Sequence, residues 1–151
     1  NYTVNDIVAY DVNSYMPYDP SSIWKTPGFH YSLNPKDDSL DVVPRLCEEY
    51  DTYVLSTGPR ISYVEKCDWL TKYYGDLFRH KFIFSDDKGV AFGDFLVDDA
   101  IHNLDRFYER MGTPICYSHP HNQQCKDIYK QVNNFAQIED YLKLMREYYG
   151  R

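Results

Sequence analysis

Short apolar runs alternate along most of this chain with longer segments whose apolar residues recur at helical spacing, and this alternation limits the fold more than any other feature. Runs of β-branched and aromatic residues predict strands, while a period of three to four residues predicts helices packed by one face. The predicted strands are 52–55, 81–84, 95–97 and 114–117, and the predicted helices are 37–49, 61–74, 100–110 and 137–148. Because alternating strands and helices are joined by right-handed crossovers, the pattern predicts an α/β fold with a mostly parallel sheet covered on both faces.

Residues 1–36 differ in character from the rest of the chain, since they are rich in Tyr, Asn, Asp and Pro. Thr3, with the acidic Asp6 three positions later, is typical of a helix N-terminus. Prolines then break the remainder of this segment into short pieces. We therefore expect two parts, a small helical cap or lid at 1–36 and an α/β core at 37–151.

The composition excludes several classes of protein. The formal net charge of −7 disfavours binding to a nucleic-acid polymer or an anionic membrane, and no apolar run is long enough for a membrane span or a signal peptide. With 16 Tyr, 8 Phe and 2 Trp, the chain has too many aromatic residues for a disordered protein. The four cysteines form no C-x-x-C pair, so we interpret them as reduced thiols of a cytoplasmic protein, not as a zinc site or a disulfide framework.

Polar residues that follow the strands are the first candidates for chemistry, because ligands of open α/β sheets bind beyond the C-terminal ends of the strands. Ser56 and Thr57 follow the run at 52–55 and precede Gly58. Hydroxyls and accessible backbone N–H groups at a strand-to-helix turn suit a phosphate oxygen. The alternative is that this pair only forms a turn and caps the next helix.

Two adjacent carboxylates, Asp98 and Asp99, follow the run at 95–97. At the end of a buried strand they repel each other, and a hard divalent cation relieves that repulsion. Mg²⁺ typically binds one or two carboxylates together with substrate phosphate oxygens and water. Alternatively, the pair caps the helix at 100–110.

Cationic residues near these strand ends could balance the charge of a phosphate. Lys88 lies in the polar loop 85–89, Arg60 comes just before the helix at 61–74, and Lys66 lies inside that helix. The alternatives are that a helical lysine is solvated and that Lys88 forms only an ion pair within its loop.

Histidines and aromatic residues give weaker signals. His119 and His121 could bind a metal, but no third ligand follows at a suitable spacing. Aromatic residues of the cap could stack on a flat base or only pack the cap against the core. They are Tyr10, Tyr15, Tyr18 and Trp24.

Taken in order, these segments resemble the haloacid-dehalogenase-like (HAD-like) phosphatases, and within them the 5'(3')-deoxyribonucleotidase family. Their order and spacing agree with that family, with Lys88 eleven residues before Asp99. The resemblance extends upstream through 22–24 and 26–29 to 10–12, so it covers essentially the whole chain. It implies a HAD-like Rossmannoid three-layer sandwich with a parallel sheet and a small helical cap. The segments that carry it are Tyr53-Val-Leu-Ser-Thr57, Glu65-Lys-Cys-Asp-Trp69, Phe82-Ile-Phe-Ser-Asp-Asp-Lys88, Gly93-Asp-Phe-Leu-Val-Asp-Asp99 and Ser118-His-Pro-His-Asn122.

The resemblance also implies roles for individual residues at a phosphate site. Ser56 would hold the transferring phosphoryl group with Thr57 beside it, and Lys88 would neutralise the charge of phosphate and nucleophile. Arg60 would be a further phosphate contact in place of the family's usual lysine. Asp99 would bind Mg²⁺, with Asp98 supporting it.

For the base of a substrate, the resemblance implies an aromatic pocket in the cap. Tyr10 and Trp24 fall where the family places that pocket. Asp11 departs from an aromatic residue often found there, which leaves the base preference open.

The implied activity is Mg²⁺-dependent hydrolysis of (deoxy)ribonucleoside 5'-monophosphates through an aspartyl-phosphate intermediate. Family members begin with a strand ending in Asp-x-Asp-Gly, whose first Asp attacks phosphorus, and nothing in this sequence matches that strand in the right place. We expect the nucleophile upstream of Asn1, on a strand that lies between the strands at 52–55 and 95–97. With one strand between them, these two strands would lie two inter-strand spacings apart, which is about 10 Å.

Two other classes of function stay open. One is a non-catalytic relative that keeps the scaffold, and the other is a phosphatase of the same superfamily acting on a non-nucleotide phosphomonoester. The expected partner is a nucleoside monophosphate, without a nucleic-acid polymer or a membrane, and a homodimer is compatible with the sequence.

Overall fold

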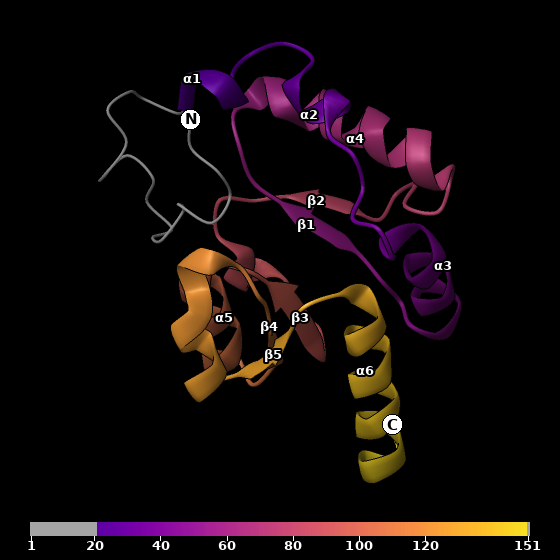
Figure 1. Cartoon of the computed structure of the whole chain (residues 1–151), viewed down its shortest axis with the longest axis vertical. Helices are drawn as coiled ribbons and strands as arrows, with labels where there is room; N and C mark the ends of the chain where they lie inside the picture. The colour runs from indigo at the N-terminus through magenta and orange to yellow at the C-terminus, as the bar shows by residue number, and fades with distance from the viewer. Residues whose placement is uncertain (1–20, 151) are drawn as a thin grey trace. The chain divides into compact units, whose positions relative to one another are not determined.

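The structure is a computed structural model that describes residues 21–150 in two compact units, 21–86 and 87–150 (Figure 1). Each unit is an arrangement of parallel strands and helices, and each is described by itself. The α/β class with parallel sheets, expected from the sequence, is confirmed. Within 21–150, no helix has both the length and the hydropathy needed to cross a bilayer.

The first unit contains a two-stranded parallel sheet, in which Val54 pairs with Phe82 and Ser56 with Phe84. The helix Arg60–Tyr74 packs on this sheet through the ring of Tyr63, which stacks on Phe84 with ring centroids 3.9 Å apart. The elements are α1 (Ser21–Trp24), α2 (Phe29–Ser32), α3 (Ser39–Glu49), β1 (Val54–Ser56), α4 (Arg60–Tyr74) and β2 (Phe82–Phe84).

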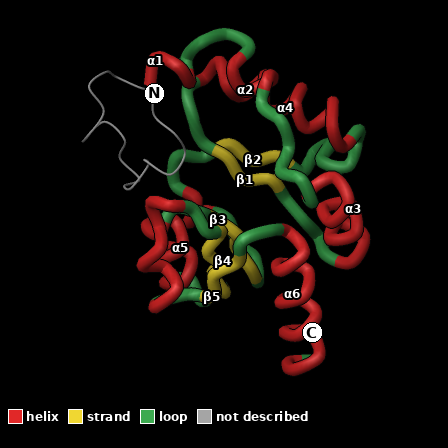
Figure 2. The backbone as a smooth tube through the Cα atoms, in the orientation of Figure 1, coloured by secondary structure: helices red, strands yellow, loops and turns green. Residues whose placement is uncertain are grey.

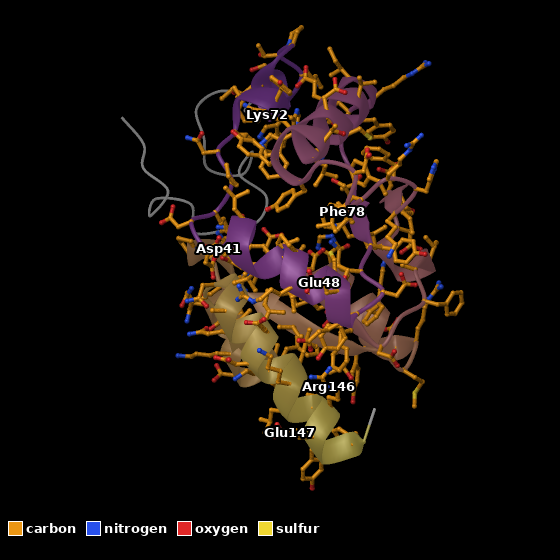
Figure 3. The ribbon with its side chains drawn as sticks, turned by 90° about the vertical axis from the view of Figure 1, so that its right-hand side faces the viewer. Asp41, Glu48, Lys72, Phe78, Arg146 and Glu147 are labelled. Carbon is orange, nitrogen blue, oxygen red and sulfur yellow. The ribbon has the colours of Figure 1, made fainter. Side chains whose placement is uncertain are left out.

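Helices α3 and α4 pack together through one apolar face of α3. Val42, Val43 and Leu46 recur at helical spacing and are buried, whereas Asp41 and Glu48 are exposed on the other face of α3 (Figure 3). The hydroxyl of Tyr74 at the end of α4 donates to the Ser39 hydroxyl at the start of α3, at 2.9 Å. This contact sets the two helices in place beside the sheet.

The second unit contains a three-stranded parallel sheet in the order β3-β4-β5 (Figure 2). Strand β4 is the central strand of this sheet, and its last four residues are all buried, with Ile115 and Cys116 fully so, which is typical of a parallel strand covered on both faces. The elements are η3 (Lys88–Val90), β3 (Phe95–Asp98), α5 (Ile101–Glu109), β4 (Thr113–Tyr117), η4 (Pro120–Asp127), β5 (Lys130–Val132) and α6 (Phe135–Tyr149).

A close approach of helix to backbone holds α5 against β3 and β4. A Cβ on Gly112 would lie 2.2 Å from the Phe107 ring, so only glycine fits at the turn from α5 into β4. Leu104 of α5 is fully buried with Cys116 and Cys125, and these three residues form the centre of this core.

Some expectations fall outside what this structure tests. Tyr10 and the rest of 1–20 lie outside the described residues, and the part of the expected cap that is described, 21–36, contains the one-turn helices α1 and α2. The boundary at residue 36 and the expected 10 Å spacing of β1 and β3 stay predictions. Strand β5 and the turns of η4 were not expected from the sequence.

Candidate functional site

The turn that follows β1 brings hydroxyl groups to the start of α4. Ser56 is the last residue of β1, and Gly58 has a φ of 145°, which other residues rarely adopt. A Cβ on Gly58 would lie 2.8 Å from the Ser62 hydroxyl oxygen, so the turn needs glycine for space as well as for conformation. The buried Ser62 donates its hydroxyl to the Pro59 carbonyl at 2.7 Å, which fixes the beginning of α4 under the turn.

A lysine of α4 reaches this turn. The Lys66 ammonium donates to the Ser56 hydroxyl oxygen at 3.0 Å and to the Thr57 carbonyl. An ammonium group can only donate, so the Ser56 oxygen accepts this bond. The Ser56 O–H itself donates to the Thr57 carbonyl at 3.5 Å, a long contact that a closer oxygen acceptor would replace. A Cβ on Gly58 would lie 3.2 Å from the same nitrogen, and glycine there lets the cation come close to the backbone. The result is a cation and a hydroxyl side by side at the end of a strand, which is a suitable arrangement for a phosphate oxygen.

Thr57 connects this turn to the end of β2. Its hydroxyl donates to the Asp86 carboxylate at 2.6 Å. Arg60, expected to contact phosphate, is the exposed first residue of α4. Ser56, Thr57, Arg60 and Lys66 therefore belong to one unit and to one strand–turn–helix segment.

Lys66 was one of the candidate cations in the sequence, with a solvated position on the helix as the alternative, and the family resemblance gave it no role. Its contacts come from the position of residues 62, 66 and 70 on one stripe of α4, at intervals of four. Ser62 and Leu70 are the two buried residues of that helix, so a lysine midway between them on the same stripe faces inward. This stripe could have indicated that Lys66 faces inward, although it does not specify which groups the ammonium contacts.

In the second unit, Asp98 and Lys88 form a buried ion pair. The Lys88 ammonium lies 2.6 Å from one Asp98 carboxylate oxygen, and the two side chains are 14% and 4% exposed. The other carboxylate oxygen accepts the Ala100 backbone N–H at 2.9 Å and the Asn103 side-chain amide at 3.0 Å. Both oxygens of Asp98 are thus engaged by neighbouring donors, and the residue holds Lys88 and the start of α5 together.

Asp99, the next residue, presents its carboxylate to the surface, since its side chain is 43% exposed. One carboxylate oxygen lies 3.4 Å from His121 Nε2, and the backbone carbonyl accepts the Asn122 side-chain amide at 2.8 Å. The His119 and His121 rings stack with centroids 5.5 Å apart, so the two histidines pack on each other beside Asp99.

A magnesium ion would find an oxygen ligand in this second unit. The residues 21–150 contain no group of three or more His, Cys, Asp or Glu arranged to hold a metal. Mg²⁺, however, keeps several water ligands and binds substrate oxygens, so one accessible carboxylate is a sufficient contribution from this unit. Asp99 fits that role and Asp98, with both oxygens engaged inside the unit, fits a supporting one.

The structure thus groups the expected site residues in two sets. Ser56, Thr57 and Arg60 lie in the first unit, while Lys88, Asp98 and Asp99 lie in the second. Their meeting at one site stays a prediction. Of the expected base-binding residues, Trp24 lies on α1 and is 42% exposed, and Tyr10 is outside the described residues.

Comparison with known proteins gives a consistent result. The model of a family described as "5' nucleotidase, deoxy (Pyrimidine), cytosolic type C protein" matches residues 2–147. A putative 5'(3')-deoxyribonucleotidase of Staphylococcus aureus is 29% identical over 123 residues, which cover 80% of this chain and 66% of the relative. The 5'(3')-deoxyribonucleotidase of Bacillus subtilis is 27% identical over 138 residues, which cover 89% of this chain and 77% of the relative. The match to the staphylococcal protein thus spans just under two thirds of that relative's length.

Proposed function

Because the chain belongs to the cytosolic type C family of deoxy (pyrimidine) 5' nucleotidases, we propose that the protein is a phosphatase that hydrolyses (deoxy)ribonucleoside 5'-monophosphates. Membership of the family confirms the resemblance inferred from the sequence. The relatives named above are 5'(3')-deoxyribonucleotidases or putative ones, which supports a nucleotide as the substrate.

The observation that carries this proposal is the contact between Lys66 and Ser56. The ammonium group accounts for one lone pair of the Ser56 oxygen, and the hydroxyl hydrogen, whose contact with the Thr57 carbonyl is 3.5 Å long, can turn to donate to a phosphoryl oxygen. The same ammonium group supplies positive charge beside that oxygen. Both groups are held before substrate arrives, because Lys66 also donates to the Thr57 carbonyl and Gly58 admits no side chain. Preorganised donors of this kind stabilise charge as it develops on a phosphoryl group.

Lys88, Asp98 and Asp99 form the second part of the proposed site. Asp98 holds the Lys88 ammonium in place, and that cation would neutralise charge on the nucleophile and the phosphate. Asp99 would bind Mg²⁺ through its exposed carboxylate. When bound, the metal ion would supply further positive charge for the phosphoryl oxygens.

The proposed reaction is a two-step transfer. An aspartate, in the role that the family resemblance gives it, attacks phosphorus while the nucleoside oxygen leaves and takes a proton from a general acid. Water then attacks phosphorus of the aspartyl-phosphate while the same group accepts a proton from that water. The bond between phosphorus and the aspartate oxygen breaks, which releases inorganic phosphate and restores the carboxylate. Ser56 and Lys66 hold the phosphoryl oxygens in both steps, and the cap, with Trp24, binds the base.

A substrate panel tests this function. Full-length protein with Mg²⁺ is expected to release phosphate from pyrimidine and purine nucleoside monophosphates faster than from sugar phosphates, and to stop when the metal ion is chelated. Faster release from sugar phosphates would support the non-nucleotide phosphatase instead. Absence of release from every compound would support the non-catalytic alternative.

A further inference from the structure

A carboxylate of α4 holds the start of α2 through backbone groups. One oxygen of Glu65 accepts the Gly28 N–H at 2.6 Å, and the other accepts the His30 N–H at 3.0 Å. Gly28 has a φ of 85°, a conformation that favours glycine and turns its N–H toward α4. Hydrogen bonds from N–H groups to an ionised carboxylate are stronger than those to a neutral acceptor.

Further contacts join the same two segments along one face of α4. The Trp69 indole N–H donates to the Leu33 carbonyl at 2.7 Å, and the Lys72 ammonium lies over the Tyr31 ring, 4.7 Å from its centroid. Residues 65, 69 and 72 are spaced by four and three, so they form a single stripe on the helix. Residues 28–33 are therefore fastened along two turns of α4, and Figure 1 shows α2 beside this helix. We call residues 28–33 the docked segment.

The residue after Glu65 is the one that holds the phosphate-binding turn. Glu65 contacts the docked segment, and Lys66 contacts Ser56 and Thr57. One turn of a rigid helix therefore connects the docked segment with the hydroxyl proposed to bind phosphate. Trp24 lies on the helix just before the docked segment, and the Thr26 N–H donates to the Ile23 carbonyl at 3.0 Å in the connection between them.

We propose that Glu65 is a positioning residue for nucleotide recognition, which fixes the distance between the phosphate-binding turn and the part of the cap that contacts the nucleoside. The inference rests on the proposed function and deepens it. A nucleotide must contact both places at once, so its binding depends on their separation. A phosphomonoester without a base contacts only the turn, and its hydrolysis does not depend on Glu65.

The experiment compares two substrates in two variants of the full-length protein. Glu65→Gln keeps the size of the side chain but places an NH₂ group against backbone N–H groups that need an acceptor. Asp68→Asn makes the same change of charge on an exposed residue one turn later in α4 and serves as the matched control. The substrates are a deoxynucleoside 5'-monophosphate and deoxyribose 5-phosphate.

We expect Glu65→Gln to lower kcat/KM for the nucleotide by about tenfold, mainly through a higher KM. The value of kcat/KM for deoxyribose 5-phosphate should stay within about twofold of that of the unaltered protein. Asp68→Asn should change neither value by more than about twofold. Trp69→Phe removes the hydrogen bond to the Leu33 carbonyl. It should also lower kcat/KM for the nucleotide relative to that for deoxyribose 5-phosphate, by a smaller factor than Glu65→Gln.

Two results would overturn the inference. One is an equal fall for both substrates in Glu65→Gln, because that is the effect of a residue that only supports the fold or the turn. The other is unchanged hydrogen exchange at the Gly28 and His30 amides, since these two amides should exchange faster once their acceptor is lost. The proposed function is tested separately, because its failure would appear as absent nucleotide hydrolysis in the unaltered protein.

Discussion

The Lys66 ammonium lies 3.0 Å from the Ser56 hydroxyl oxygen, with the backbone of Gly58 beside it. A strand end, a glycine turn and a helix stripe meet at this contact. Since the cation and the hydroxyl are both in place without substrate, the site should bind an oxyanion without rearrangement of the turn. Four predictions follow from this and the neighbouring contacts.

Lys66→Met should lower kcat/KM for a nucleoside monophosphate by a factor on the order of 10²–10³, because a preorganised donor to the phosphoryl group is lost. Steady-state phosphate release measures this effect. Arg79→Met removes a cation from an exposed position of the same unit and should leave the rate within about twofold. Equal losses in the two variants would mean that Lys66 acts only through net charge.

Asp98→Asn should destabilise the second unit by about 3 kcal/mol, because it leaves the Lys88 ammonium buried without its counter-charge. The asparagine can still accept the Ala100 N–H, so the change isolates the ion pair. The double variant Lys88→Met/Asp98→Asn should recover part of that loss. Free energies of unfolding in urea, measured for the two single variants and the double variant, would show this recovery. If the loss of stability in the double variant equals the sum of the two single losses, a direct pairing of Lys88 and Asp98 is contradicted.

Asp99→Ala should abolish nucleotide hydrolysis while changing the free energy of unfolding by no more than about 0.5 kcal/mol. The side chain is 43% exposed, and the bond from Asn122 goes to the backbone carbonyl, which the substitution keeps. Activity and urea unfolding of the same preparation test both parts. Retained turnover at saturating Mg²⁺ would exclude Asp99 as a metal ligand.

Docking of residues 28–33 should weaken in acid in two steps. Burial, with a contribution from the nearby Lys66 cation, lowers the pKa of His30 below 6.5, although Glu65 opposes the shift. The Gly28 N–H lowers the pKa of Glu65 below 4.5, as do contacts with His30. His30 and Glu65 both bind fewer protons when the segment is docked than when it is released. Each group therefore stabilises docking at a pH above the pKa that it has in the released segment. This stabilisation is lost as the pH falls through the lower pKa that the group has in the docked segment.

Hydrogen exchange of the amides of 28–31, corrected for its intrinsic pH dependence, measures this docking. It should accelerate as the pH falls below about 6.5 and again below about 4.5. His30→Gln should remove the first step and Glu65→Gln the second. A single step that neither variant alters would show that other groups control the docking.

Local patterns were sufficient for most of the fold. Helices α3, α4, α5 and α6 were located within about two residues of their observed ends. A repeating apolar face indicated α3, α5 and α6, whereas α4, whose buried residues are only Ser62 and Leu70, was indicated by its apolar content and by Gly75 at its end. Strand β5 escaped prediction since only Val132 of its three residues is buried, and Lys130 and Gln131 carry no strand signal. Pairing with β4 forms this strand, and pairing is not a local property.

The placement of Ser56 and of the Asp98–Asp99 pair at strand ends was predictable from the sequence, because each follows a short apolar run, while their roles at a phosphate site stay predictions. The two aspartates have different surroundings because Asp98 is the last residue of β3 and is buried against Lys88, whereas Asp99 lies in the connection to α5 and is partly exposed. The contacts of Lys66 depend on how α4 packs over the turn, which no single segment of the sequence specifies.

The adjacency of Glu65 and Lys66 limits how α4 can change in evolution. Each residue advances about 100° around a helix axis, so an insertion or deletion between these two positions would rotate one contact away while leaving the other in place. Related chains that keep both contacts should therefore have no gap within this helix, and length variation should be confined to the loops on either side of it.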